Sequence, residues 1–270
     1  MGDLAFAAAL SHAPGIAAFT DKAPEQQRRG FLEAAAKVGA QLDASKPDAI
    51  VFIAPDHFTN FFVDRMPAFC VGMNEDYEGP VEKWLGIPKG RVPGAPDLAA
   101  HLLEEAMESG FDPAFSRGLK LEHSVMVPMS LIRPQRDIPI VWIMVNCQVA
   151  PMPSLRRCYD FGKILRKTIG LRSERIAVIA TGGLSHAPGA AEASRLDPDF
   201  DRQFLAMLAS DQPTAVLDIP LSRLDQAGFG SWEIRPWAVA LGATEGRPAQ
   251  TLSYAPIEAW QTGCAVSVFS

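Results

Sequence analysis

Histidine is scarce in this sequence, and most of its histidines stand where a strand or turn pattern ends. The 270 residues contain 5 histidines, and four of these follow or adjoin such a pattern: His12, His57, His123 and His186. His101 instead lies inside a helical pattern, where we expect a surface or partly buried side chain. Imidazole is the commonest metal ligand and a natural acid/base near neutral pH. Four such groups at strand exits therefore predict one shared site.

One hexapeptide occurs twice. Leu-Ser-His-Ala-Pro-Gly fills positions 10–15 and again positions 184–189, and both copies follow an apolar run. The repeat is either a coincidence of a common strand-to-loop pattern or a sign that two loops bring His12 and His186 to one edge of a sheet. Ligands of open α/β sheets bind at the carboxyl ends of the strands, which favours the second interpretation.

A metal site built on two histidines also requires a carboxylate. Asp56 adjoins His57, but neighbouring residues of a strand point to opposite faces, so we do not expect both to bind one metal. Glu233 follows a Gly-rich turn and precedes an apolar helical segment. A buried carboxylate there is costly unless it is paired or bound to a metal, yet a carboxylate is also favoured at a helix N-terminus by the dipole. The residues leave these two roles of Glu233 equally open, and Arg235 is likewise either a contact for a substrate carboxylate or a structural arginine.

Strand and helix patterns alternate along the chain and must position these side chains. Short, nearly continuous apolar runs are typical of strands covered on both faces, and they occupy residues 4–10, 49–54, 138–145, 176–180 and 264–269. Apolar residues at helical spacing predict helices over residues 25–42, 97–108, 154–169 and 199–209. Residues 74–96, with four prolines and four glycines, are predicted to form a long irregular loop. The alternation predicts one α/β domain over residues 1–270, with a mainly parallel or mixed central sheet flanked by helices and an active site at the strand C-terminal ends.

Composition and charge exclude several classes of protein. A chain with 48% hydrophobic and 21% charged residues is typical of a globular protein and excludes a disordered or fibrous one. The formal net charge of −6 argues against nucleic acid or an anionic membrane as the main partner. No run approaches the roughly 20 apolar residues of a membrane span. Without a secretion signal or a Cys-x-x-Cys spacing, we expect a cytoplasmic protein with reduced cysteines.

Taken in order, these motifs resemble the class III (protocatechuate 4,5-dioxygenase-type) extradiol dioxygenases. The resemblance runs over nearly the whole chain. It is carried by Ser11-His12, by Asp56-His57-Phe58, by Gly-Gly-Leu-Ser-His at 182–186, by residues 197–204, by Glu-Ile-Arg-Pro-Trp at 233–237, and by residues 257–264.

The resemblance implies a non-haem Fe(II) held by His12, His57 and Glu233, with His186 as the catalytic acid/base and His123 as a second active-site histidine. Two histidines and a carboxylate occupy one face of iron and leave the other positions open, as in non-haem Fe(II) oxygenases. The implied reaction is extradiol cleavage of a catechol-type, ortho-dihydroxylated ring by O2 in aromatic catabolism, with both oxygen atoms incorporated. The implied assembly is an oligomer, either of one chain type or with a small second subunit.

One departure from the family pattern concerns the second histidine. The family usually has Asp-His-Gly where this chain has Glu122-His123-Ser124, which places the hydrogen-bond partners of His123 in question. Two alternative functions remain open at this stage. A zinc-dependent hydrolase can use the same two histidines and glutamate to activate water. A non-catalytic relative can serve as a binding subunit. Such a subunit would need none of His12, His57, Glu233 and His186, so the presence of all four argues against it.

Overall fold

A mixed sheet of eight strands forms the centre of the molecule. The computed structural model describes residues 2–189 and 196–270. The strand order is β6-β3-β7-β2-β8-β1-β10-β9. The four inner strands β7, β2, β8 and β1 are parallel to one another, whereas β3 and β10 pair antiparallel with β7 and β1. The α/β fold with a mixed central sheet, predicted from the sequence, is confirmed.

The elements have the following bounds. The strands are β1 (Asp3–Leu10), β2 (Ala49–Ala54), β3 (Phe69–Gly72), β4 (Asp76–Gly79), β5 (Gly90–Pro93), β6 (Ala114–Ser116), β7 (Ile140–Val145), β8 (Arg175–Thr181), β9 (Ala249–Ile257) and β10 (Thr262–Phe269). The α-helices are α1 (Gly15–Ala18), α2 (Glu25–Ser45), α3 (Pro96–Glu108), α4 (His123–Ile132), α5 (Leu155–Leu171), α6 (Pro198–Leu208), α7 (Leu221–Gln226) and α8 (Ile234–Ala243).

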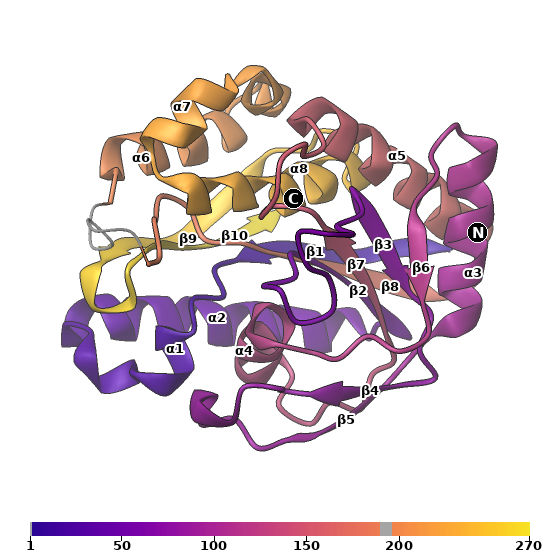
Figure 1. Cartoon of the computed structure of the whole chain (residues 1–270), viewed down its shortest axis with the longest axis horizontal. Helices are drawn as coiled ribbons and strands as arrows, with labels where there is room; N and C mark the ends of the chain where they lie inside the picture. Colours follow the sequence, from indigo (N-terminus) through magenta and orange to yellow (C-terminus); the bar gives the residue numbers. More distant parts are fainter. Residues whose placement is uncertain (1, 190–195) are drawn as a thin grey trace.

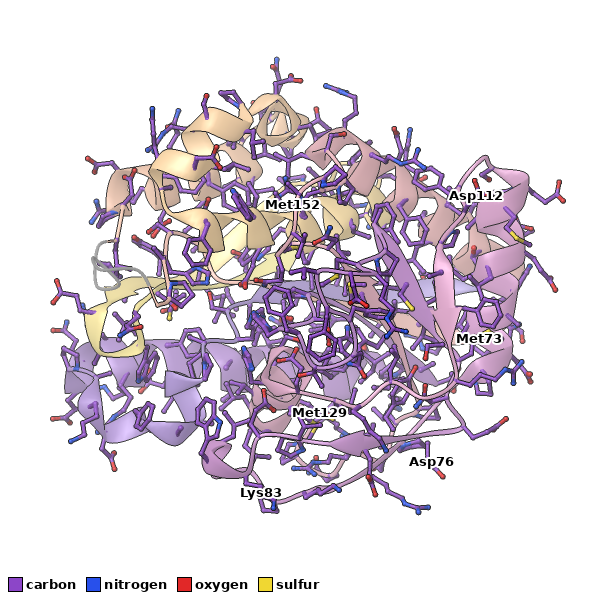
Figure 2. The ribbon with its side chains drawn as sticks, viewed as in Figure 1. Met73, Asp76, Lys83, Asp112, Met129 and Met152 are labelled. Atoms are coloured by element: carbon purple, nitrogen blue, oxygen red, sulfur yellow. The ribbon has the colours of Figure 1, made fainter. Side chains whose placement is uncertain are left out.

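Helices cover both faces of the sheet. One apolar core joins the sheet to α3, α5, α6 and α8, and a second core joins its other face to α2 and α4. Figure 1 shows these two layers above and below the sheet, and Figure 2 shows the side chains that fill the space between ribbon layers. Within the described ranges, no helix combines the length and apolarity that crossing a bilayer requires.

The predicted strands and helices all form, within a few residues of the expected bounds. The prediction of an irregular loop over residues 74–96 is wrong in part, because β4 and β5 pair there as a small antiparallel sheet around a 3-10 turn, Lys83–Leu85. Strand β9 and helix α4 were not predicted from the sequence. Strand β9 is polar and partly exposed along much of its length, and α4 is buried all round and contains Pro128, so neither has a clear apolar stripe.

Three of the parallel strands end at one edge of the sheet, as predicted. Leu10 of β1 pairs with Thr181 of β8, and β2 lies on the other side of β8. His12, His57 and His186 follow these three ends. The expectation that His123 also leaves a strand is wrong, because it is the first residue of α4, where the Glu122 side chain caps the helix.

Helix α8 is held against α5 by a contact between backbones. A Cβ atom added to Gly162 of α5 would overlap the Val239 carbonyl oxygen, and one added to Gly242 of α8 would overlap the Tyr159 carbonyl oxygen. These two glycines let the helices approach more closely than side chains would permit. Because Glu233 immediately precedes α8, this contact also sets the position of the candidate carboxylate.

We expect Gly162→Ala to lower the free energy of unfolding by about 1–3 kcal/mol, because the new methyl group must push the two helices apart. Gly170→Ala is the matched control in the same helix, since a Cβ there meets nothing within 4 Å. That control should be neutral or stabilising by up to about 1 kcal/mol, owing to the better helix propensity of alanine. Urea unfolding of both variants provides the comparison, and equal effects would contradict the account of the α5–α8 contact.

Candidate active site

A cavity of about 440 Å³ opens at the edge where the parallel strands end. Its volume falls within the range of small-molecule sites, roughly 300–1,000 Å³. All five residues singled out in the sequence line it: His12, His57, His123, His186 and Glu233. The loops after β1, β2 and β8 supply His12, His57 and His186, and the N-terminal ends of α4 and α8 supply the other two residues.

Glu233 lies at the centre of this group and is only 2% exposed. Its Oε2 is 3.2 Å from His12 Nε2, and its Oε1 is 3.0 Å from His57 Nε2. The backbone N–H of Gly183 donates a hydrogen bond of 2.8 Å to Oε2. Burial alone would raise the pKa of Glu233, but His12 and His186 hold that pKa well below its usual value. Glu233 is therefore a buried carboxylate anion that faces two imidazole nitrogens.

The ring of His12 is oriented by a hydroxyl group. Its Nδ1 lies 3.1 Å from Thr181 Oγ1, and that hydroxyl donates its own hydrogen to the Ser124 carbonyl oxygen at 2.8 Å. The hydroxyl therefore accepts from Nδ1–H, which leaves Nε2 without a hydrogen when the ring is neutral. Burial lowers the pKa of His12. Both effects favour a neutral imidazole whose free Nε2 lone pair points at Glu233.

His57 has the same arrangement with a carboxylate as its outer partner. Its Nδ1 lies 3.2 Å from Glu122 Oε2, while Nε2 faces Glu233. Burial alone would lower the pKa of His57, but Glu122 and Glu233 raise it well above its usual value. The neighbouring Asp56 accepts backbone hydrogen bonds from residues 59–61 and shapes the loop, in agreement with the expectation that Asp56 and His57 do not share a metal.

The donor set of His12, His57 and Glu233 fits a metal cofactor. Adjacent ligands of an octahedral ion with bonds of about 2.1 Å lie about 3 Å apart, close to the separations between Glu233 and the two imidazoles. Metal-binding histidines characteristically donate their other ring N–H to a carboxylate or another oxygen, as both rings do here. Ligand atoms of His12, His57 and His123 also lie within 4.8 Å of one another, so the third histidine borders the same space.

His186 occupies a slot between two glycines. Its Nδ1 lies 2.9 Å from the Leu184 carbonyl oxygen, which can only accept, so Nδ1 carries a hydrogen. Its Nε2 is 3.8 Å from Glu233 Oε2, too far for a hydrogen bond, and is free to accept a proton. A Cβ at Gly183 would lie 2.6 Å from the ring, and a Cβ at Gly230 would overlap it. Burial alone would lower the pKa of His186, but Glu233 raises it above its usual value.

The repeated hexapeptide places its two histidines at different distances from the sheet. The first copy begins at the last residue of β1, whereas the second begins three residues after Thr181, the end of β8. The structure brings both histidines to Glu233, which confirms the interpretation of two loops at one sheet edge. The offset between the copies leaves His12 closer to the carboxylate than His186.

A buried aspartate fixes the loop that carries His186. Asp201 of α6 accepts hydrogen bonds from the Ser185 backbone N–H at 2.7 Å, from the Ser185 hydroxyl at 2.8 Å and from the Tyr254 hydroxyl at 2.8 Å. Burial raises the pKa of Asp201 to about 6, although these hydrogen bonds oppose the shift. Asp201 thus ties α6 and β9 to the residue next to His186, a role that sequence spacing did not reveal.

Two glutamates surround His123. Its Nδ1 lies 2.7 Å from Glu82 Oε1 and 2.7 Å from Glu122 Oε2. Burial alone would lower the pKa of His123, but Glu122 raises it above its usual value. Glu122, the residue that departs from the family pattern, therefore contacts His57 and His123 together. Glu82 lies in the Pro/Gly-rich segment about 40 positions earlier, and nothing in the sequence pattern pointed to it.

Arg235 is buried and donates to the carbonyl oxygens of Pro153 and Trp232 at 2.7 and 2.9 Å. Those contacts agree with the structural role considered for it. His101 lies on α3 and is partly buried, with its Nε2 3.8 Å from Glu105, as expected.

Comparison with known proteins places the chain in a family. Residues 6–265 match the family described as the catalytic LigB subunit of aromatic ring-opening dioxygenase. The chain belongs to this family. The extradiol dioxygenase resemblance read from the sequence is thereby confirmed.

Two curated relatives illustrate the family. A 2,3-dihydroxyphenylpropionate/2,3-dihydroxicinnamic acid 1,2-dioxygenase of Paraburkholderia xenovorans is 29% identical, over 93% of each chain. A second enzyme with this activity, from Pseudomonas putida, is 26% identical over 92% of this chain and 93% of its own. Among solved structures, an uncharacterized protein of Escherichia coli K12 matches 98% of this chain and 99% of its own with a TM-score of 0.66. Its sequence identity of 18% supports the fold alone.

We expect Gly230→Ala to displace the His186 ring and to lower turnover of a catechol by about 10²-fold, the cost of a misplacement of about 1 Å. Metal content should stay near normal, because the atoms nearest to the added methyl group all belong to His186 and not to His12 or His57. Gly118→Ala, at a position with nothing within 4 Å, is the control and should behave like the parent protein. Parent-like turnover of Gly230→Ala would show that the slot does not position His186.

Proposed function

We propose that this protein is a non-haem Fe(II)-dependent extradiol dioxygenase that opens the ring of an ortho-dihydroxylated aromatic compound with O2. The observation that carries the proposal is the convergence of His12 Nε2, His57 Nε2 and the Glu233 carboxylate. Each of these three side chains is oriented by a hydrogen-bond partner of its own. These three residues would bind the iron. Fe(II), when bound, would supply electrons to O2 and so remove the spin restriction on its reaction with a singlet ring.

The charges of the iron-binding residues favour a catecholate monoanion. A bound divalent ion would displace the ring proton of His57, because a histidine ligand must be neutral. One ionised glutamate beside two neutral imidazoles would then leave the ion and its ligands with a net charge of +1. A singly ionised diol therefore makes the assembly neutral, which favours its binding in a site shielded from water. The buried position of Glu233 at the α8 terminus keeps this arrangement rigid.

His186 would move the substrate proton. Its Nδ1–H is occupied by the Leu184 carbonyl oxygen, so Nε2 is the atom that can take a proton from the second hydroxyl of the diol and return it later. His123 would hydrogen-bond to the anion that develops on the substrate, because Glu82 and Glu122 favour its protonated form. The ligand histidines and the proton carrier thus have separate roles.

Replacement of Glu233 by alanine tests the iron site. We expect Glu233→Ala to lose most bound Fe(II) and most activity while keeping the fold, because the carboxylate ligand between His12 and His57 is removed. Iron content after anaerobic loading and gel filtration is the measurement. Glu108→Ala, an exposed carboxylate at the end of α3, should bind iron like the parent. Full iron occupancy in Glu233→Ala would sink the ligand assignment.

Replacement of His186 by alanine separates proton transfer from metal binding. His186→Ala should keep near-normal iron but lower kcat by roughly 10²- to 10⁴-fold, the range for a lost general acid/base. The acid limb of the kcat profile against pH should also shift or vanish. His101→Ala, at a partly buried position of α3 that does not line the cavity, is the control. Loss of iron together with activity would instead make His186 a ligand and would require a different proton carrier.

A further inference from the structure

The outer half of the cavity is an aromatic wall built from three distant segments. Phe19 follows α1, Trp84 lies in the 3-10 turn after β4, and Trp260 precedes β10; all three line the cavity. The Phe19 and Trp84 rings stack with centroids 6.5 Å apart and planes 17° apart. Both side chains are more than half exposed, at 52% and 57%, although neither is needed to fill the core.

Further contacts fix one member of this wall. The Trp260 indole N–H donates to the Phe19 carbonyl oxygen at 3.2 Å. Trp260 also lies against the first residue of α1, where a Cβ at Gly15 would approach the indole Cδ1 to 2.7 Å. The rings of Trp260 and Phe31 of α2 pack in a T-shaped arrangement. Trp260 is therefore held in place and joined to the Phe19 backbone, and the three rings form an apolar surface on the cavity wall.

The charged side chains around the inner end of the cavity are already paired with one another. Glu233 lines the cavity beside His12 and His57, whereas Glu82 and Glu122 lie behind its lining, in contact with His57 and His123. Among the described residues that line the cavity, none is lysine or arginine. Lys83 adjoins Trp84 in sequence, but it is exposed at the margin of the molecule and does not line the cavity (Figure 2). Against the described rings of Phe19, Trp84 and Trp260, a carboxylate carried on the substrate would lose water beside aromatic faces that offer it no positive charge.

We propose that this site selects catechols whose ring substituent is uncharged and apolar, an aryl or branched alkyl group, which binds on the wall of Phe19, Trp84 and Trp260. The inference rests on the proposed function. It sets this chain apart from the relatives named above, because the substrates in their names carry a carboxylate on the side chain. Binding of an apolar group against aromatic faces is favourable, because the group is removed from water. Binding of a carboxylate of the same size is less favourable, because its desolvation costs free energy.

A matched pair of substrates tests the selectivity. 3-(3-Methylbutyl)catechol and 3-(2-carboxyethyl)catechol have side chains of equal size and similar shape and differ in charge. With the Fe(II)-loaded protein, kcat/KM should be at least about 10-fold higher for the neutral compound, within the range that one pocket contact supplies. Anaerobic equilibrium binding, which needs no turnover, should show the same order. Unsubstituted catechol gives the reference rate.

Variants of the wall locate the effect. Trp84→Ala and Phe19→Ala should each lower the ratio of kcat/KM for the methylbutyl compound over unsubstituted catechol by about 5- to 10-fold. Phe115→Ala, an equally exposed aromatic residue on β6 away from the cavity, should leave that ratio unchanged. Trp84→Lys, which places a cation at the mouth, should shift the preference toward the carboxyethyl compound.

Two outcomes would overturn the inference, and they are distinguishable. Equal or higher kcat/KM for the carboxyethyl compound, with unsubstituted catechol still cleaved, would refute the substituent class and leave the proposed function standing. No cleavage of any catechol by iron-loaded protein would refute the proposed function, and the inference with it.

Discussion

The buried negative charge of Glu233 is the constraint on which the rest of the site depends. A carboxylate that is 2% exposed must be compensated. One backbone N–H donates to it, and the Nε2 atoms of two imidazoles lie within 3.2 Å of it, where a bound cation would complete the compensation. Each imidazole is in turn fixed by an oxygen on its far side, from Thr181 or Glu122. The ring nitrogens therefore face the carboxylate in a defined orientation, which is what a metal site requires of its ligands.

Two parts of the fold position Glu233 and the histidines around it. Parallel strands β1, β2 and β8 bring three histidine loops to one edge of the sheet, and α8 brings Glu233 across from the helical layer. The close approach of α5 and α8 through Gly162 and Gly242 fixes the position of α8 against α5. Glycines also shape the site itself, because Gly183 and Gly230 leave the space that the His186 ring occupies.

Much of this architecture is readable in the sequence, because buried strands and amphipathic helices leave strong periodic signals. The apolar runs before His12, His57 and His186 predicted the sheet edge, and the repeated hexapeptide predicted that His12 and His186 lie near each other. The family resemblance supplied the pairing of these histidines with Glu233, which the residues alone left open.

Other features escaped prediction for physical reasons. Glu82, Thr181 and Asp201 act through contacts between segments far apart in the chain, and no local spacing encodes such contacts. Helix α4 has no polar face, so His123 was expected at a strand exit instead of at a helix N-terminus. The aromatic wall was also invisible, because Phe19, Trp84 and Trp260 meet only in the folded chain.

The most direct test of the account compares two metals in one protein. Metal-free protein would be loaded anaerobically with Fe(II) or with Zn(II), mixed with unsubstituted catechol, and exposed to O2 in an oxygen electrode while the absorbance of the ring-opened product is followed. The account predicts that only the Fe(II) form consumes O2, with one O2 taken up for each product molecule formed. A zinc-loaded protein that hydrolyses esters or amides, beside an iron-loaded protein that takes up no O2, would contradict it.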